Sequence, residues 1–522
     1  MNSILSVLVF LPLFGAILVG LVPGSSIRTV RALTLFLTVI LFLAALPLAF
    51  QFQGEGPMEF EQDIPWIPAL GISYHVGVDG ISFYLILLTA FLAPLVYLST
   101  WNAVKTRVKE FSIWYLLLHT GMMGAFVALD LFLFYLFWEL MLIPMAFLIG
   151  VWGGERRIYA AVKFVLYTVV GSLLMLVAIL VLVKQASGVN GFVSFDWTDL
   201  VGVAVPPGMQ ILLFAAFALA FAIKVPLFPF HTWLPDAHVE APTAGSAILA
   251  GILLKMGTYG FLRFAMPLFP EAARTAAPVL SLLAVIGIIY GALVAMVQDD
   301  VKKLVAYSSV SHLGFVVLGL FAFNVAGIEG GIYVMLAHGL STSALFLLVG
   351  VLYERRHTRK IADYGGLART MPLFATVFLI TTLASIGLPT LSGFVGEFLV
   401  LFGTFRVSPV HAAFAATGVV FGAVYMLWMY RRVFFGPVTN DANRKLPDLS
   451  LRELVVIVPL LAGMVWLGVR PSPLLDKMEA AVKAHIRMMT PRDRAEAPRA
   501  EGGFAAFTSP RTAADGEEGK LR

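Results

Sequence analysis

Apolar residues run along this chain in stretches of about 20, separated by short segments that carry charge, Pro or Gly. A helix of about 20 apolar residues is long enough to cross the hydrocarbon core of a lipid bilayer. Counting by apolar length and by these breaks predicts an all-α polytopic membrane protein with about fourteen transmembrane helices. The predicted spans cover residues 3–22, 30–50, 79–98, 112–129, 131–152, 159–183, 209–228, 244–266, 277–297, 303–323, 329–353, 372–404, 410–433 and 453–469.

A faint internal repeat lies within these spans. The sixth span begins at Arg157 with Arg-Ile-Tyr, and the eleventh begins at Gly331 with Gly-Ile-Tyr. One span later in both cases, Pro and Gly interrupt the helix, at residues 224–229 and at residues 387–393. Five spans separate the matching elements, and an odd number places two units in opposite membrane orientations. The pattern therefore predicts two inverted five-helix repeats with broken helices 7 and 12.

Two segments depart from the pattern of long apolar runs. The loop 51–78 is acidic and rich in Pro and aromatic residues, and we expect it to hold a short hairpin outside the bilayer. After Pro471 the composition changes, so we expect a disordered tail without a long amphipathic helix. The chain then divides into an N-terminal three-helix segment (1–110), a first repeat unit (111–270), a second repeat unit (271–435), a last transmembrane helix (436–470) and the tail (471–522).

The composition supports a bilayer as the solvent of this chain. Of the 522 residues, 59% are hydrophobic and only 13% are charged, which is too few charges to cover a soluble domain of this size. Cys is absent, which removes disulfides, thiolate zinc sites and Cys-held iron–sulfur clusters. We therefore predict no cofactor, and any electrons must be carried by another chain. The net charge of +5 does not indicate nucleic acid, because the basic residues lie in loops that flank the membrane.

The distribution of Lys and Arg predicts the orientation, since cytoplasmic loops carry an excess of both. The loops on one side hold most of these cations, whereas the other side holds only Lys184, Arg263, Arg274 and Arg406. Both termini are therefore expected on the non-cytoplasmic side of a bacterial plasma membrane. Residues 1–22 lack a basic start and a small-residue cleavage site, so we expect a retained helix rather than a signal peptide.

Four ionisable residues stand out inside the predicted spans: Glu139, Lys224, Lys255 and Glu397. Such a group costs roughly 2.5–3.5 kcal/mol to insert at mid-bilayer, so it tends to face the bundle interior and to take part in function. The two acids and two bases approximately balance, and a buried pair of opposite sign shares its desolvation cost. The alternative is that they are static salt bridges that hold the bundle together.

The helix interruptions favour a working role for these charges. Pro226 and Pro229 lack an N–H, so we expect the carbonyls of Ala222 and Val225 to be free at membrane depth. Free backbone groups at that depth are tolerated mainly where protein or water lines a cavity. Lys224 lies directly beside this break. A desolvated Lys that gains and loses a carboxylate partner can take up and release a proton near neutral pH.

Histidine supplies possible relays between these charges. His312 in the tenth span and His338 in the eleventh lie among hydroxyl and small side chains that can hold water. A buried structural role is the alternative for both residues. Another polar cluster falls in one loop without the spacing of a helical metal site, and we expect it to cap the loop and order water: His231, Asp236, His238 and Glu240. We predict no metal site, and the chain has no motif of an enzyme that acts alone.

Several motifs carry a family resemblance. Residues 223–246 read IKVPLFPFHTWLPDAHVEAPTAGS and continue through LLKMGTYG at 253–260, which closely resembles the signature of the antiporter-like membrane subunits of complex I, the respiratory NADH:quinone oxidoreductase. Residues 298–314 resemble a second signature of that family and residues 78–82 a third. The resemblance covers about residues 1–470. It implies fourteen helices in two inverted five-helix units, with broken seventh and twelfth helices.

The resemblance also implies roles for individual residues. Glu139 and Lys224 match a proton-handling pair, Lys255 matches the central proton carrier, and Glu397 matches the terminal group of a second half-channel. His312 and His338 match polar positions on the axis between the two halves. Several relatives have Lys at the twelfth-helix position and one subunit type has Glu, so the sequence favours that type.

The implied function is proton translocation coupled to quinone reduction elsewhere in the complex, with no redox chemistry on this chain. The implied partners are other membrane-arm subunits, including two related antiporter-like subunits that flank it. One alternative is a subunit of a multi-subunit cation/proton antiporter, although an extra carboxylate-rich cation site is lacking. The other is a membrane-arm scaffold that conducts nothing, against which the four central charges speak.

Overall fold

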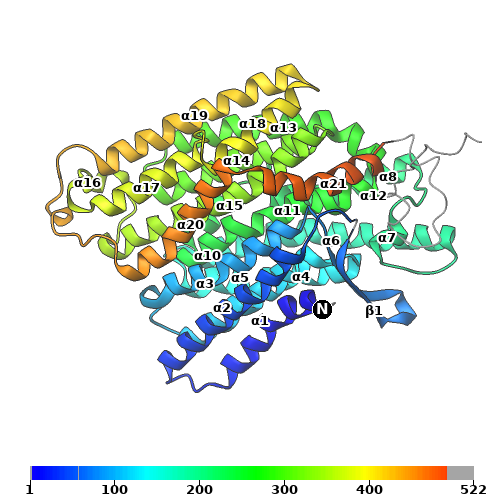
Figure 1. Ribbon diagram of the computed structural model, residues 1–522, viewed down its shortest axis with the longest axis horizontal. Coiled ribbons are helices and arrows are strands. Elements are labelled where there is room, and N and C mark those ends of the chain that lie inside the picture. Colours follow the sequence, from blue (N-terminus) through cyan, green and yellow to red (C-terminus); the bar gives the residue numbers. More distant parts are fainter. Residues whose placement is uncertain (1–2, 57, 491–522) are drawn as a thin grey trace, which may run out of the picture.

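The computed structural model describes residues 3–56 and 58–490, which form an elongated bundle of helices with a β-hairpin at one end (Figure 1). The first helices are α1 (Ile4–Leu21), α2 (Ile27–Gln51), α3 (Phe83–Ala103), α4 (Val108–Val127), α5 (Leu131–Trp152), α6 (Arg157–Asn190), α7 (Trp197–Leu200) and α8 (Pro207–Lys224). The central helices are α9 (Trp233–Glu240), α10 (Thr243–Ile248), α11 (Leu254–Gly260), α12 (Met266–Leu268), α13 (Pro270–Met296), α14 (Val301–Leu320) and α15 (Val325–Arg356). The last helices are α16 (Leu367–Thr370), α17 (Pro372–Ser385), α18 (Ser392–Phe405), α19 (Pro409–Phe434), α20 (Leu451–Val469) and α21 (Ser472–Met488).

Within the described residues, 12 helical stretches are long and apolar enough to cross a membrane. The predicted twelfth span instead holds two shorter apolar helices, α17 and α18, and the predicted fourth span holds α4. The chain is therefore an all-α multi-pass membrane protein, as predicted. The total of about fourteen spans and the two inverted repeats stay predictions.

The centre of the bundle consists of helices that are buried on all sides. In the most apolar 18-residue segment of Thr243–Leu268, 100% of the residues are buried, and in that of α15, 94% are buried. In the corresponding segments of α2 and α19, only 33% of the residues are buried. Helices that are apolar all round belong in the interior of a bundle or face lipid. The polar residues on α11, α14 and α15 are thus enclosed by protein rather than lipid.

Strands β1 (Glu59–Ile67) and β2 (Ile72–Val78) confirm the predicted hairpin in the loop 51–78. They pair antiparallel, with Glu59 opposite Val78 and Ile67 opposite Ile72. The hairpin projects from the end of the bundle where α7 also lies (Figure 1).

Both predicted interruptions are present, but the first differs in detail. α8 ends at Lys224, and the N–H of Leu227 donates to the carbonyl of Ala222 at 2.8 Å. The expectation of a free carbonyl is therefore wrong for Ala222, because the chain turns back early enough to provide another donor. The second interruption separates α17 from α18. Residues 233–240, expected to be a loop, form α9.

The prediction of a disordered tail is wrong for its first part. Ser472–Met488 form the 17-residue helix α21, whose buried positions recur every three or four residues. The period is hard to recognise in the sequence because Ala481, Ala484 and His485 occupy part of the buried face. Residues 491–522, the rest of the predicted tail, lie outside the described residues.

Candidate functional site

Four of the predicted site residues form a connected string at the centre of the bundle. Lys255 Nζ on α11 lies 2.7 Å from Nδ1 of His338 on α15. The rings of His338 and His312, which is on α14, have centroids 5.7 Å apart. His312 Nδ1 in turn lies 2.9 Å from Oε1 of Glu397 on α18. We call Lys255, His338, His312 and Glu397 the relay string.

The relay string is enclosed but not fully bonded. Lys255 is 0% exposed and Glu397 is 6% exposed. The Nε2 atoms of His312 and His338 are buried and have no hydrogen-bond partner among the described residues. Buried polar atoms normally have a partner, and in a polar site that partner is often water. The string therefore has free polar atoms along which a proton can move.

The protonation states of Lys255 and Glu397 determine which atom is the donor in each hydrogen bond of the relay string. A charged Lys has only donors, so Nδ1 of His338 accepts from Lys255 when the amine is protonated. An ionised carboxylate only accepts, so Nδ1 of His312 carries the hydrogen that binds Glu397. The two rings therefore hold opposite tautomers when Lys255 is charged and Glu397 is ionised.

The helix around Lys255 explains its position. α11 lies between two π-helical segments, η2 (Leu249–Leu253) and η3 (Phe261–Ala265). The wider π turn disturbs the regular helical bonds, and the carbonyl of Ala250 accepts a hydrogen bond from Lys255 Nζ. The amine is thus held between a backbone carbonyl of its own helix and His338.

The other two predicted residues, Glu139 and Lys224, do not form an ion pair with each other. Lys224 is 1% exposed, and its Nζ lies 5.1 Å from the centre of the Trp138 ring and 5.7 Å from that of Phe164. Within the described chain, Nζ has no hydrogen-bond or ion-pair partner. Glu139 on α5 is half-buried and close enough to act on Lys224 electrostatically. Lys224 is therefore an enclosed cation, stabilised by ring faces and by the negative end of α8.

Sequence reasoning missed a buried ion pair in the helical stretch that also carries Lys255. Arg263 was counted with the loop cations although it lies within the predicted span 244–266; it is buried in η3 and forms an ion pair with Asp79. Its Nε also donates to the hydroxyl of Tyr259 at 3.3 Å, and its guanidinium lies 5.7 Å from the centre of the Trp197 ring. Asp79 belongs to the motif at 78–82, so an acid there opposite a lone Arg inside the eighth span was the available signal.

The members of the cluster that was expected to cap a loop have separate roles, and Glu240 is the one that caps a loop N–H. Asp236 forms an ion pair with Lys163 at 2.7 Å, and Glu240 accepts from the N–H of Arg156 at 2.9 Å. His238 is buried without a partner in the described part of the chain. The described residues include no group of three or more His, Asp or Glu that could hold a metal ion.

Outside the spans, His75 connects the hairpin to the segment before α7. Its Nε2 lies 2.7 Å from Glu61, and its Nδ1 binds Asp196. Burial lowers the pKa of His75, but the hydrogen bonds and charges of Asp196 and Glu61 outweigh this effect and raise the pKa to about 10. The imidazole is therefore charged at neutral pH.

Known proteins are similar to this chain in sequence and in fold. The family described as NADH:quinone oxidoreductase/Mrp antiporter, TM, matches residues 128–422. The chain is 48% identical to NADH-quinone oxidoreductase subunit M of Rhodobacter capsulatus, over 93% of this chain and 96% of that protein. It is 45% identical to NADH-ubiquinone oxidoreductase chain 4 of Marchantia polymorpha, over 92% of this chain and 96% of that one.

A solved structure gives the same result. A chain of the respiratory complex I from Thermus thermophilus with bound NADH matches with a TM-score of 0.85 and 36% identity, covering 93% of this chain and 100% of that chain. The chain belongs to the family of transmembrane subunits shared by NADH:quinone oxidoreductases and Mrp antiporters. The family predicted from residues 223–260 is confirmed.

Proposed function

We propose that this chain is a proton-translocating, antiporter-like subunit of an NADH:quinone oxidoreductase, of the type called subunit M. The observation that carries the proposal is the relay string, which joins a buried cation to a buried carboxylate through two imidazoles. The high identity to relatives named as subunit M supports the choice of complex. Glu397 supports it too, since Glu rather than Lys at this position favours that subunit type.

The setting follows from the same proposal. The chain works in a bacterial plasma membrane with both termini on the non-cytoplasmic side, and related antiporter-like subunits flank it in the membrane arm. Other chains of the complex carry the electrons. The translocase function of this chain is therefore to move protons when quinone reduction changes charges elsewhere in the complex.

In each step of proton transfer along the relay string, the group that gains a proton takes it from a neighbouring group that loses one. A proton passes from Lys255 Nζ to Nδ1 of His338, and the proton on Nε2 of His338 leaves toward His312. Glu397 then takes the proton from Nδ1 of His312 and later releases it on the non-cytoplasmic side. His can accept a proton at one nitrogen and release one from the other, which suits both rings to this role.

Glu139 and Lys224 supply the switch in this scheme. A charge change on the neighbouring subunit moves the carboxylate of Glu139 toward or away from Lys224, which alters how much positive charge acts on Lys255. Without the partial screening by Glu139, the cation repels the proton on Lys255 and drives it into the relay string. The first repeat unit thus holds the switch and the second unit holds most of the relay.

The test is a paired measurement on membranes that carry Glu139→Gln. We expect NADH:quinone turnover and proton pumping to fall together while the complex assembles normally, because the amide carries no charge and cannot screen Lys224. The exposed carboxylate of Glu155 provides a matched control, and Glu155→Gln should behave as the wild type. Normal turnover and pumping in Glu139→Gln would make this residue structural and favour the non-conducting scaffold.

A further inference from the structure

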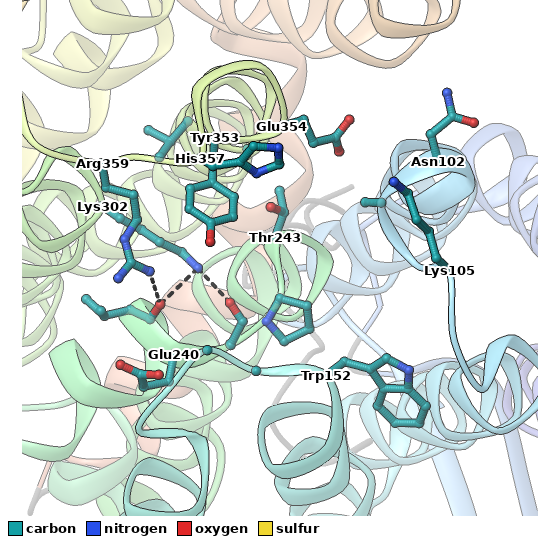
Figure 2. A pocket seen from close by; sticks show the side chains of 18 of the residues that line it. Asn102, Lys105, Trp152, Glu240, Thr243, Lys302, Tyr353, Glu354, His357 and Arg359 are labelled. Carbon is teal, nitrogen blue, oxygen red and sulfur yellow. Dashed lines mark hydrogen bonds between the residues drawn. The ribbon is translucent and has the colours of Figure 1, made fainter. Parts of the chain in front are cut away.

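A cavity of about 730 Å³ opens at the end of the bundle that carries the basic loops. Its lining comes from α2, from the ends of α3, α5, α9 and α15, and from the start of α14. Sites for small molecules usually have volumes of roughly 300–1,000 Å³, so this space is large enough for a molecule much bigger than a water. Figure 2 shows the side chains that surround it.

Positively charged side chains line the cavity on two sides. Arg31 on α2 donates to the carbonyl of Val104 at 2.8 Å, next to Lys105. Lys302 and Arg359 line the cavity from α14 and from the loop after α15. Figure 2 shows Lys105 across the open space from Lys302 and Arg359. An anion between the two sides would therefore have cations on both.

The two acids of the lining, Glu240 and Glu354, do not balance these cations. In the part of the chain that the structure describes, neither acid forms an ion pair with a cation of the lining. Glu240 accepts from the backbone N–H of Arg156 at 2.9 Å, outside the cavity. Glu354 interacts electrostatically most with Arg452, which does not line the cavity. The cavity therefore keeps positive charge that no acid of its lining neutralises.

Lys302 is a buried cation at the wall of this cavity. Its side chain is only 7% exposed, and its Nζ donates to the carbonyls of Ala241 at 2.6 Å and Val239 at 3.3 Å, as Figure 2 shows. A charged amine has three hydrogens, so one remains for another acceptor. Buried charges are normally paired, and among the described residues Lys302 has no ion-pair partner. An anionic oxygen in the cavity would satisfy both requirements.

Aromatic rings place this cavity at the surface of the membrane. Trp101, Trp152 and Tyr353 belong to its lining. Tyr353 is 44% exposed, and Trp152 Nε1 donates to the carbonyl of Thr106 at 2.9 Å. Trp and Tyr gather at the level of the lipid headgroups, where their rings have an apolar body and a polar tip. The cavity therefore lies at headgroup depth.

A smaller recess of about 20 Å³ adjoins the cavity and shares Thr243, Gly350 and Glu354 with it. Part of its wall is formed by apolar side chains of α15 and α20, namely Leu347, Val351, Val456 and Ile457. The recess is too small for a headgroup, but it continues the cavity toward α20. Only 33% of the residues in the most apolar segment of α20 are buried, so this helix borders the lipid. The polar cavity thus has an apolar side that faces the bilayer.

We propose that this cavity binds the headgroup of an anionic phospholipid, with its phosphate between Lys105 and Lys302 and its acyl chains directed past α20. Basic pockets between transmembrane helices at the cytoplasmic end are typical sites for such headgroups. A free phosphate would meet the same cations, but it would use neither the aromatic rings nor the apolar side of the cavity. The bound lipid joins the loop after α3 to the start of α14. This site is separate from the relay string and does not depend on the proposed function.

The first test is a photocrosslink in native membranes that contain the intact complex. Tyr353 is replaced by p-benzoylphenylalanine, which attaches to a neighbouring molecule under ultraviolet light, and mass spectrometry identifies the adduct. The same replacement at Phe147, which is also 44% exposed and lies near the same end of α5, reports the bulk lipid. Anionic phospholipid should be enriched at Tyr353 at least about fivefold over Phe147. Adducts of equal composition at both positions, or no lipid adduct at Tyr353, would overturn the proposal.

Charge removal tests the cations. Lys105→Gln and Lys302→Gln should each lower the enrichment at Tyr353 about fivefold, as expected for one basic residue at an anionic membrane surface. Lys109→Gln is the matched control, since Lys109 lies at the same end but outside the lining, and it should change nothing. If Lys302→Gln does not assemble, Lys105→Gln decides. Unchanged enrichment in Lys105→Gln would overturn the assignment.

Inorganic phosphate separates a lipid from a free anion. The purified complex should unfold at a higher temperature in nanodiscs of phosphatidylcholine with added phosphatidylglycerol than in phosphatidylcholine alone. Lys105→Gln should reduce this difference, whereas Lys109→Gln should keep it. Phosphate added to the phosphatidylcholine nanodiscs should not replace the anionic lipid. Full replacement by phosphate in the wild type, but not in Lys105→Gln, would make the site one for free phosphate and overturn the lipid assignment.

Discussion

The two helix breaks have the same backbone arrangement. Leu227 in the first break and Leu388 in the second each donate to a carbonyl five residues earlier, at 2.8 Å and 3.1 Å. In both breaks, the residue three positions later donates back to that Leu, from Phe230 at 2.6 Å and from Leu391 at 3.0 Å. Two copies of one ancestral unit would show this likeness.

The charges at the two breaks are placed differently. Lys224 comes before the first break, whereas Glu397 comes after the second. Aligned on the two breaks, Ser385 is the counterpart of Lys224, and Asp236 is the counterpart of Glu397. Asp236 is bound to Lys163, and the Ser385 hydroxyl has no partner within the described residues. Each break thus has one charge to which the proposed function gives a role, and the two charges lie on opposite sides of a shared turn.

The different positions of the two charges suggest different roles for the two breaks: an electrostatic role for Lys224 and proton transfer for Glu397. The cation of the first break is isolated among rings, so it acts on its surroundings by charge. The acid of the second break belongs to the relay string, and under the proposed function it exchanges protons. Under the proposed function, the predicted repeat therefore holds a switch in one half and a relay in the other.

The largest effect is expected from breaking the relay at its end. Glu397→Gln should lower turnover and pumping at least about tenfold, because an amide cannot take the proton from His312. Glu397→Asp keeps a titratable group and should retain part of the pumping. Both are measured as proton uptake by inverted vesicles during NADH oxidation. Normal pumping in Glu397→Gln would mean that the two breaks do not differ as described.

A Lys-to-Arg exchange at both positions sharpens the comparison. Arg keeps its positive charge at all relevant pH values and also binds well against ring faces. Lys224→Arg should therefore retain more than about half of the pumping, since the switch needs only the cation. Lys255→Arg should lose most of it, because the carrier must release a proton. Equal losses in the two variants would contradict the division between switch and relay.

We expect the buried Asp79–Arg263 pair to be static, so it provides a reference for the charges of the proposed function. Arg263→Met leaves the carboxylate of Asp79 buried and unpaired, which should cost about 3–5 kcal/mol of stability. The double variant Asp79→Asn with Arg263→Met should recover most of that loss. Thermal unfolding of the purified complex measures the stability. The ratio of protons pumped to electrons transferred should stay normal in the complexes that survive, and a changed ratio would place this pair among the working charges.

The smallest effect is expected at the titratable anchor of the hairpin. The pKa of His75 is raised from 6.5 to about 10, so its stabilising contribution is complete below about pH 6.5 and is lost as the pH rises through about 10. Limited proteolysis of residues 59–78 should therefore be faster at pH 10 than at pH 7. The variant His75→Asn should show a weaker dependence on pH, and an equally strong dependence would assign the effect to another group.

The sequence predicted those features that the bilayer imposes on short stretches of the chain. Apolar length marks the spans, Pro and Gly mark the two breaks, and the cost of burial singles out Lys255 and Glu397. It did not foresee contacts that depend on tertiary structure. Glu139 and Lys224 were expected to pair, but rings enclose the amine instead. The bond from Lys255 to His338 was not foreseen either, because it joins two helices whose packing the sequence pattern does not specify.

The C-terminal helix α21 has a consequence for the biogenesis of this protein. Lys477 donates to the carbonyl of Phe52 at 2.6 Å and lies over the rings of Phe52 and Phe83. A Cβ atom at Gly80 would lie 2.5 Å from the Lys477 carbonyl oxygen, so this Gly lets α21 approach. The ribosome makes Lys477 only after every span has been synthesised. The surface around Phe52 and Gly80 therefore stays uncovered until α21 has been synthesised. A chain cut short before residue 472 would expose this surface to the membrane proteases that remove incomplete proteins.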